Sequence, residues 1–123
     1  MIRPTHREIL HKITQAGEAV ARGKIAIINP VAIAADALEL AYEMAELAAV
    51  LSELLVQVKP GDYVGASPPQ PSYEEEIFQS DLYAFICSCS RFGCDVYFKF
   101  SLKNDTLWLV SLHRERSKKR ETP

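Results

Sequence analysis

The sequence lacks the long hydrophobic runs that mark membrane proteins. None of its 123 residues lies in such a run, since a membrane-spanning helix needs about 18 uninterrupted apolar residues. The opening stretch, MIRPTHREIL, also lacks the apolar region of a signal peptide. We therefore expect a cytoplasmic protein that makes no contact with a membrane.

Cysteine is scarce, and its arrangement is unlike that of a secreted protein. Cys87, Cys89 and Cys94 are an odd number crowded into eight positions, whereas disulfide frameworks use even numbers spread along the chain. Structural zinc sites bring two closely spaced pairs of ligands, and no fourth ligand lies nearby in the sequence. We interpret the three residues as thiols that behave as small apolar side chains. The sequence predicts neither a metal nor a cofactor; a regulatory thiol function is a weaker alternative.

Charge is distributed unevenly along the chain. The net charge is +3 over residues 1–29, −9 over residues 30–81 and +4 over residues 82–123, although the whole chain carries only −2. An acidic middle disfavours binding of a polyanion over most of the surface and permits it on one face. Composition and length are those of a soluble globular protein of one domain, residues 1–123.

The first half of the chain has a helical pattern. Thr5 and Glu8 form a capping-box motif, and apolar residues then recur at helical spacing, which predicts a helix over residues 5–22. Lys24–Ile28 is either a brief strand or a linker. Asn29 and Pro30 mark a second helical start. From there to residue 58, propensity alone allows one helix of nearly thirty residues or two helices in tandem.

The second half changes to the alternating pattern of strands. Residues 59–76 hold three Gly/Pro clusters and predict a connector without regular structure. Three antiparallel strands are expected within residues 77–115, followed by a frayed tail at 116–123. The expected fold class is therefore α+β, with a helical half (about 5–58) packed on one side of an antiparallel sheet of three or more strands.

The register of the last hairpin decides which residues share a face. A three-residue turn, Lys103-Asn104-Asp105, would pair Phe100 with Trp108 and Phe98 with Val110, which gives one fully apolar face. A two-residue turn would instead oppose Phe98 with Ser111 and mix polar groups into the core. We therefore predict the three-residue turn. The opposite face then carries Tyr97, Lys99, Ser101, Leu107, Leu109, Ser111 and His113.

These residues resemble a known family. The segments IFQSDLY (77–83), VYFKF (96–100) and VSLH (110–113), with helical stretches at 37–42 and 50–54 and GDYVG at 61–65, follow the order of motifs in the MqsR-type toxins of bacterial toxin–antitoxin systems. The likeness covers roughly residues 35–115. It implies a RelE-like ribonuclease fold, an mRNA endoribonuclease activity, and a cognate antitoxin as protein partner. It also places a helix break near residues 41–43.

The resemblance also assigns candidate site residues. The family's catalytic glutamine and tyrosine fall on Gln79 and Tyr97, and its lysine near the end of the last strand falls on His113. A further family lysine falls on Gly65, so weakened or altered catalysis is one expectation. Another cation, such as Lys59 or Arg91, could replace that lysine from elsewhere in the fold.

The residues on this face could also supply the chemistry without reference to a family. RNA cleavage without a metal needs a base, an acid and a donor for the phosphate. His113 could be acid or base, Tyr97 could position the phosphate or stack on a base, and Lys99 could bind the phosphate. The remaining candidate RNA-binding residues are Arg114, Arg116 and Tyr63.

Three alternatives remain open at this point. The polar face could be an ordinary solvated sheet face. The protein could be a non-catalytic module that keeps the fold and binds another protein or a second copy as a homodimer. The acidic run at residues 74–76 could be solvated loop, a lid that mimics phosphate, or an antitoxin contact. His6 and His11 are expected on the surface, because their spacing of five residues does not place them on one helix face.

Overall fold

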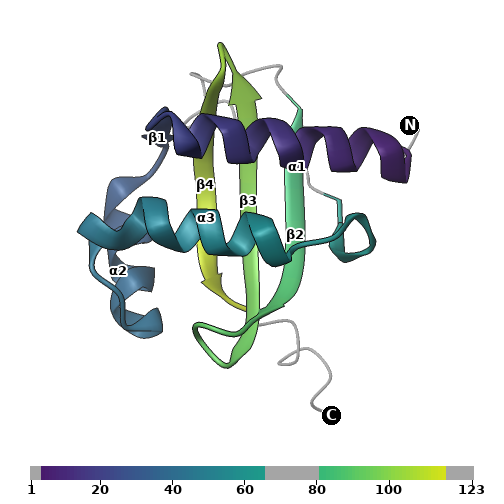
Figure 1. Cartoon of the computed structure of the whole chain (residues 1–123). Coiled ribbons are helices and arrows are strands. Elements are labelled where there is room, and N and C mark those ends of the chain that lie inside the picture. The colour runs from purple at the N-terminus through teal and green to yellow at the C-terminus, as the bar shows by residue number, and fades with distance from the viewer. Residues whose placement is uncertain (1–3, 66–80, 116–123) are drawn as a thin grey trace.

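A computed structural model describes residues 4–65 and 81–115. The helices are α1 (His6–Ala21), α2 (Pro30–Leu40) and α3 (Leu47–Gln57), with short 3₁₀ helices η1 (Met44–Glu46) and η2 (Pro60–Asp62). The strands are β1 (Ile25–Ile27), β2 (Leu82–Cys89), β3 (Cys94–Lys103) and β4 (Thr106–Arg114) (Figure 1). The expected α+β fold class is confirmed. The predicted tail at 116–123 and most of the predicted connector, 59–76, lie outside the described residues. The described part of the connector contains the short helix η2.

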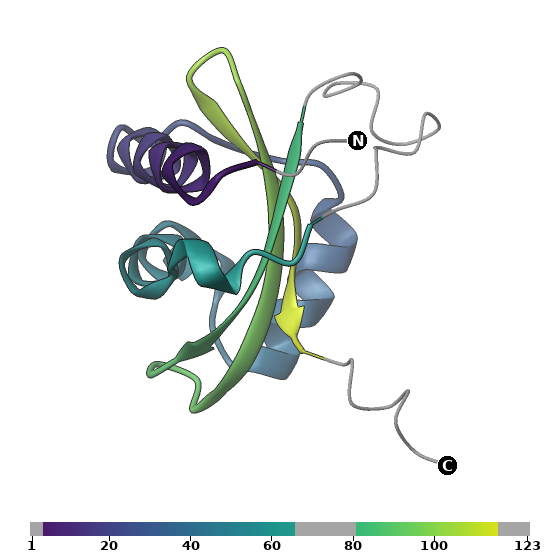
Figure 2. The same ribbon diagram turned by 90° about the vertical axis from the view of Figure 1, so that its right-hand side faces the viewer.

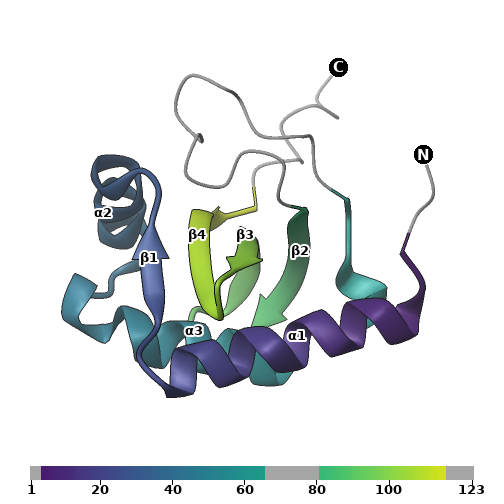
Figure 3. The same ribbon diagram turned by 90° about the horizontal axis from the view of Figure 1, so that it is seen from above.

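The four strands form one mixed sheet in the order β1-β4-β3-β2. Strands β2, β3 and β4 are antiparallel neighbours, and β1 runs parallel to β4. Helices α1 and α3 lie side by side across one face, whereas α2 lies on the other side of the sheet next to β4 (Figures 1, 2 and 3). The prediction that all helices pack on one side is therefore wrong for α2. The short strand β1 is an edge strand of the sheet and follows α1 in the chain. After β1 the chain crosses to the other side of the sheet, where it forms α2 (Figure 3).

Helix boundaries follow the capping signals in the sequence. Thr5 Oγ1 accepts from the Glu8 amide at 3.1 Å, and Glu8 Oε1 accepts from the Thr5 amide at 2.8 Å, as the capping box predicts. Asn29 Oδ1 accepts from the Ala32 amide at 3.2 Å at the start of α2. Ala41 ends α2 in the left-handed region, at φ 63°. The acidic segment is therefore two helices in tandem, with the break where the family resemblance places it.

The hydrophobic core lies between the sheet and the pair α1 and α3. Phe85, Phe98 and Phe100 are fully buried, and their rings stack with centroid separations of 5.5–6.1 Å. Aromatic stacking of this kind stabilises a core beyond the area that it buries. The helices contribute apolar side chains at helical spacing: Ile9, Ile13, Ala16, Leu47, Val50, Leu51 and Leu54.

The turn between β3 and β4 corrects the predicted register. Lys103 pairs with Thr106, so the turn has two residues, Asn104 and Asp105, both with positive φ (56° and 61°). Two consecutive left-handed residues make the type I′ turn that best fits the twist of a hairpin, and Asn and Asp tolerate this conformation. The prediction of a three-residue turn is therefore wrong.

A β-bulge keeps polar groups out of the core despite the shorter turn. Phe100 pairs with Leu109 and Lys99 pairs with Ser111, so Val110 is an extra residue in β4. Above the bulge, leucine side chains at 107 and 109 point into the core, where both are fully buried. The prediction had placed these two leucines on the polar face. Below the bulge the pairing is shifted by two residues from the prediction, since Phe98 lies opposite Leu112 and not Val110. Side chains alternate along a strand, so a shift of two residues leaves Tyr97, Lys99 and His113 on the predicted face.

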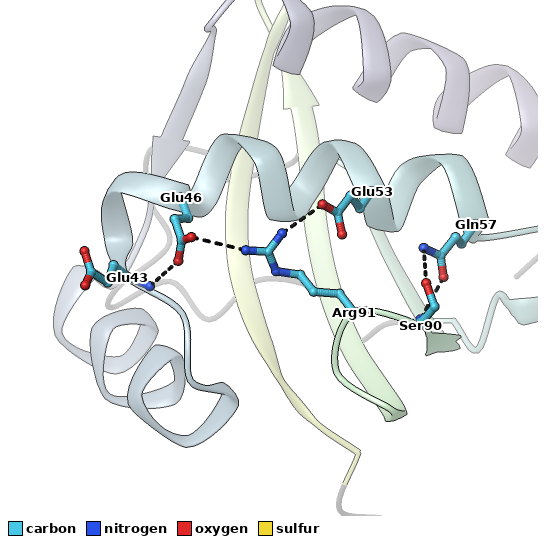
Figure 4. Close-up of polar contacts among 6 residues, drawn as sticks. All are labelled: Glu43, Glu46, Glu53, Gln57, Ser90 and Arg91. Carbon is cyan, nitrogen blue, oxygen red and sulfur yellow. Dashed lines mark hydrogen bonds and ion pairs between the residues drawn. The ribbon is translucent and has the colours of Figure 1, made fainter.

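The hairpin between β2 and β3 is fixed to α3 by polar contacts. Arg91 donates to Glu53 at 2.8 Å and to Glu46 at 3.3 Å, and Gln57 exchanges two hydrogen bonds with Ser90 (Figure 4). These groups are partly exposed, so each ion pair contributes little free energy, on the order of 0.2–1 kcal/mol.

Within residues 4–65 and 81–115, no helix is both long and apolar enough to cross a membrane.

Candidate functional site on the outer sheet face

We call the sheet face that points away from α1 and α3 the outer face. Side chains alternate along a strand, so the burial of Phe98 and Phe100 against the helices directs Tyr97 and Lys99 to this face. Across β4, Lys99 pairs with Ser111 and Tyr97 pairs with His113. The structure therefore brings together Tyr97, Lys99 and His113, three of the predicted site residues. All three side chains are partly exposed.

Tyr97 and His113 form the closest aromatic contact of this face. Their ring centroids lie 5.1 Å apart and the ring planes differ by 24°. Burial, and secondly the negative charge of Glu115, raises the pKa of the Tyr97 hydroxyl. The hydroxyl therefore stays protonated at neutral pH, as a hydrogen-bond donor.

The histidine ring is held by a backbone contact that selects its tautomer. Nδ1 of His113 lies 2.8 Å from the carbonyl oxygen of Arg114. Because a carbonyl oxygen can only accept, Nδ1 must carry a proton and donate it. In the neutral ring Nε2 then has its lone pair and can accept a proton from another group.

Lys99 and Ser111 give the centre of the outer face donors for an oxyanion. Lys99 is flanked by Ser111 on β4 and by Ala84 on β2. Ala84 is fully buried and Ser111 is partly exposed. An ammonium group beside a hydroxyl group is an arrangement that can bind a phosphate oxygen.

The lower end of the outer face carries negative charge. Asp95 accepts a hydrogen bond from the Ser88 hydroxyl at 2.9 Å, and its backbone carbonyl accepts from the Glu115 amide at 3.0 Å. By strand alternation both carboxylates belong to the same face as Tyr97. A phosphate would therefore be repelled from this end and drawn towards Lys99.

Two predicted RNA-binding residues lie apart from this cluster. Tyr63 forms a β-bridge with Phe85, and its ring packs against the Phe85 ring at 5.7 Å on the helical side of the sheet. Arg114 pairs with Val96, whose side chain is buried in the core, so alternation places Arg114 on the other face from His113. Its main chain contributes to the site, through the carbonyl that fixes His113.

Some of the remaining predicted residues lie outside the described part of the chain, and the others have a defined position in the structure. Gln79, Arg116 and the acidic run at 74–76 lie outside the ranges 4–65 and 81–115. Arg91, considered as a replacement for the family lysine, is bound to Glu46 of η1 and Glu53 of α3 on the helical side. The expected surface positions of His6 and His11 are confirmed.

The cysteines lie mainly in the core and carry no metal-ligand geometry. Cys87 and Cys89 are buried with the helices, and Cys94 is partly exposed. Burial raises the pKa of the Cys87 thiol to about 12, with a smaller contribution from Asp62. Such a thiol is a poor nucleophile. Among the described residues, no three metal-ligating side chains gather in one place.

Sequence reasoning missed the position of Ser111 beside Lys99 and the role of the Arg114 carbonyl. The predicted register put Ser111 on this face but opposite Tyr97, whereas in the structure Ser111 pairs with Lys99. The second depends on backbone geometry that no residue pattern encodes.

Comparison with protein-family models finds no match to this chain, and comparison with curated proteins finds none either.

Proposed function

We propose that this protein is a metal-independent endoribonuclease that cleaves mRNA, the toxin of a cytoplasmic toxin–antitoxin pair. The observation that carries the proposal is the stacking of the Tyr97 ring on the His113 ring, with Lys99 two residues further along β3 on the same face. The motif order that resembles MqsR-type toxins supports the same activity, and would make the cognate antitoxin the protein partner.

The proposed reaction is an attack of the ribose 2′-hydroxyl on the adjacent phosphorus. Nε2 of His113 takes the 2′-hydroxyl proton as the O–P bond forms. The bond from phosphorus to the 5′ oxygen breaks, and this oxygen receives a proton from the Tyr97 hydroxyl. The products are a 2′,3′-cyclic phosphate and a 5′-hydroxyl end, and water returns the proton from His113 to Tyr97.

Lys99 and Ser111 stabilise the charge that develops on the phosphate. Preorganised donors of this kind lower the barrier because they need no reorientation during the reaction. The raised pKa of Tyr97 suits the role of acid, since the group is protonated at neutral pH and its partner, a departing alkoxide, is far more basic. Gln79 and Arg116 belong to the proposal through the resemblance and sequence alone.

A non-catalytic interaction module is the second candidate function. Gly65, at the position of a family lysine, has no side chain, and its φ of 77° favours glycine there. The carboxylates of Asp95 and Glu115 also reduce the attraction of the outer face for RNA. A module would keep the fold and bind a protein partner without cleaving RNA.

Expression in a bacterial host separates the two candidates. The endoribonuclease predicts growth arrest and fragmentation of cellular mRNA by the wild type, and neither with the His113→Ala variant. His11→Ala, which removes an exposed histidine from α1, is the matched control and should arrest growth like the wild type. If the wild type and His113→Ala leave mRNA equally intact, the protein is not a ribonuclease of this kind.

A further inference from the structure

Helix α2 is apolar on almost every side. Asp36 and Glu39 are its only polar side chains. A helix of this composition is normally buried on all sides. In the fold, however, α2 lies at the periphery, with only one side against the sheet (Figures 2 and 3).

The buried and exposed residues of α2 form two opposite stripes. Ile33, Ala37 and Leu40 are buried in the core. The exposed stripe consists of Val31, Ala34, Ala35 and Leu38, at positions i, i+3, i+4 and i+7. Val31 is 81% exposed and Leu38 is 83% exposed.

We call Val31, Ala34, Ala35 and Leu38 the α2 stripe. Its two large residues stand at the ends and its two alanines in the middle. Small central residues let a second helix approach closely, and packed helices lie about 8–10 Å apart. A single exposed apolar residue, such as Val56 on α3, needs no explanation, but four in helical register indicate an interaction surface.

The charge around the stripe indicates the chemistry of the partner. Residues 30–58 contain five carboxylates and no lysine or arginine. Three of them, Asp36, Glu39 and Glu43, lie on α2 or within three residues of its end. Two copies of the chain that met here would bring like charges together, whereas a basic partner would find opposite charge.

We propose that the α2 stripe binds a basic amphipathic helix of another protein. Large apolar side chains of the partner helix, such as leucine at positions i, i+3, i+4 and i+7, would cover Val31 and Leu38. The axis of the partner helix would then cross α2 over the two alanines. Lysine or arginine on its flank would face Glu39, the exposed carboxylate of α2 that borders the stripe. This is the groove mode of helix recognition, and it does not depend on ribonuclease activity.

The test is a binding titration with a fluorescein-labelled 14-residue peptide. The peptide has leucine and alanine at the i, i+3, i+4 and i+7 positions and lysine elsewhere, and a peptide of the same composition in shuffled order is its control. The double variant Val31→Asp/Leu38→Asp disrupts the stripe. Its matched control, Leu10→Asp/Val56→Asp, adds the same two charges at exposed apolar positions on α1 and α3. Circular dichroism verifies that both variants fold.

The two double variants give opposite results if docking is apolar. The stripe variant should bind the peptide at least ten-fold more weakly than the wild type, although it is more acidic. The control variant should bind as tightly as the wild type or more tightly, and the shuffled peptide should bind weakly to all three. The proposal is overturned if the stripe variant binds at least as well as the wild type, or if the wild type does not bind. Sedimentation that shows a wild-type dimer, dissociated by the stripe variant, would also overturn it, because a second copy would then occupy the stripe.

Discussion

His113 and Tyr97 face each other across β3 and β4, with their ring centroids 5.1 Å apart. The contact exists because one extra residue in β4, Val110, shifts the pairing by one residue; without it Tyr97 would lie opposite Leu112. It joins an imidazole with a defined tautomer to a hydroxyl with a raised pKa.

Loss of the imidazole should abolish most of the proposed cleavage. For His113→Ala we expect the rate constant for cleavage of a synthetic RNA to fall by about 100- to 10,000-fold, the usual contribution of a general base. The ring is partly exposed, so the free energy of unfolding should change by less than about 1 kcal/mol. Urea unfolding and single-turnover cleavage measure the two quantities. A decrease in rate that matches a loss of folded protein would contradict a catalytic role.

Lys99 should matter for the phosphate and not for the fold. In Lys99→Ala we expect cleavage to fall by about 100-fold or more, the typical loss when one oxyanion donor is removed. Lys103→Ala removes the same charge four residues further along β3 and is the matched control. Cleavage by the two variants at equal ionic strength separates a specific contact from a change in overall charge. Equal losses in both would indicate charge alone.

The bulge at Val110 offers a test of the sheet register. Deleting Val110 leaves Leu109 paired with Phe100 and Ser111 paired with Lys99, so the stack of Tyr97 on His113 should persist. The cost should be about 1–3 kcal/mol of unfolding free energy, since Val110 packs with Leu82.

Deletion of Leu112 is the matched control for this experiment. It also removes one residue from β4, but with Ser111 still paired to Lys99 it brings His113 opposite Phe98 in the core, and it should cost about 3 kcal/mol or more. Chemical denaturation and cross-strand nuclear Overhauser effects between the rings at 97 and 113 measure both effects. Equal destabilisation by the two deletions would mean that Val110 is not the extra residue.

Tyr42 should destabilise the fold at alkaline pH. Burial, and secondly the charge of Asp36, raises its pKa from 10.0 to about 12, and its hydroxyl has no hydrogen-bond partner within the described part of the chain. Above pH 10 the unfolded chain releases this proton while the folded chain keeps it, so stability falls as the pH rises towards 12. Tyr83 and Cys87, each with a pKa raised to about 12 by burial, add to the same loss.

The Tyr42→Phe variant isolates the contribution of this hydroxyl. We expect an unfolding free energy at neutral pH that is unchanged or higher by up to about 1 kcal/mol, because no hydrogen bond to a described residue is lost. The decrease in stability between neutral pH and pH 10.5 should be smaller than in the wild type. Urea unfolding at both pH values measures this. A variant destabilised at neutral pH by much more than 1 kcal/mol would show that the hydroxyl has a partner.

Local signals in the sequence predicted most of the fold. The capping residues Thr5 and Asn29 gave the starts of two helices, and alternation gave the three long strands. The break at Ala41 could not be read from propensity, because alanine favours helix and its left-handed backbone is imposed by packing. The place of α2 on the second face is likewise decided by tertiary contacts.

The site could be predicted only in part. The grouping of Tyr97, Lys99 and His113 was correct, although the turn that led to it was wrong, because turn and bulge each shift the register by one residue. Tyr63 packs on the helical side of the sheet, and an aromatic residue in a Gly/Pro-rich segment gives no sign of which face it will pack on. Where the family has a lysine this chain has Gly65, so the resemblance does not identify which residue would carry that charge here. The catalytic residues assigned through the resemblance remain proposals.

Cleavage of a defined RNA by the purified protein in the presence of EDTA is the decisive test of the proposed ribonuclease activity. We expect the wild type to cut the RNA to a 2′,3′-cyclic phosphate and a 5′-hydroxyl end, identified by mass spectrometry. We also expect a 2′-O-methyl group at the cut site to block the reaction and His113→Ala to leave the RNA intact. An RNA that the wild type leaves intact, or cuts only when a divalent metal is supplied, would contradict the proposal.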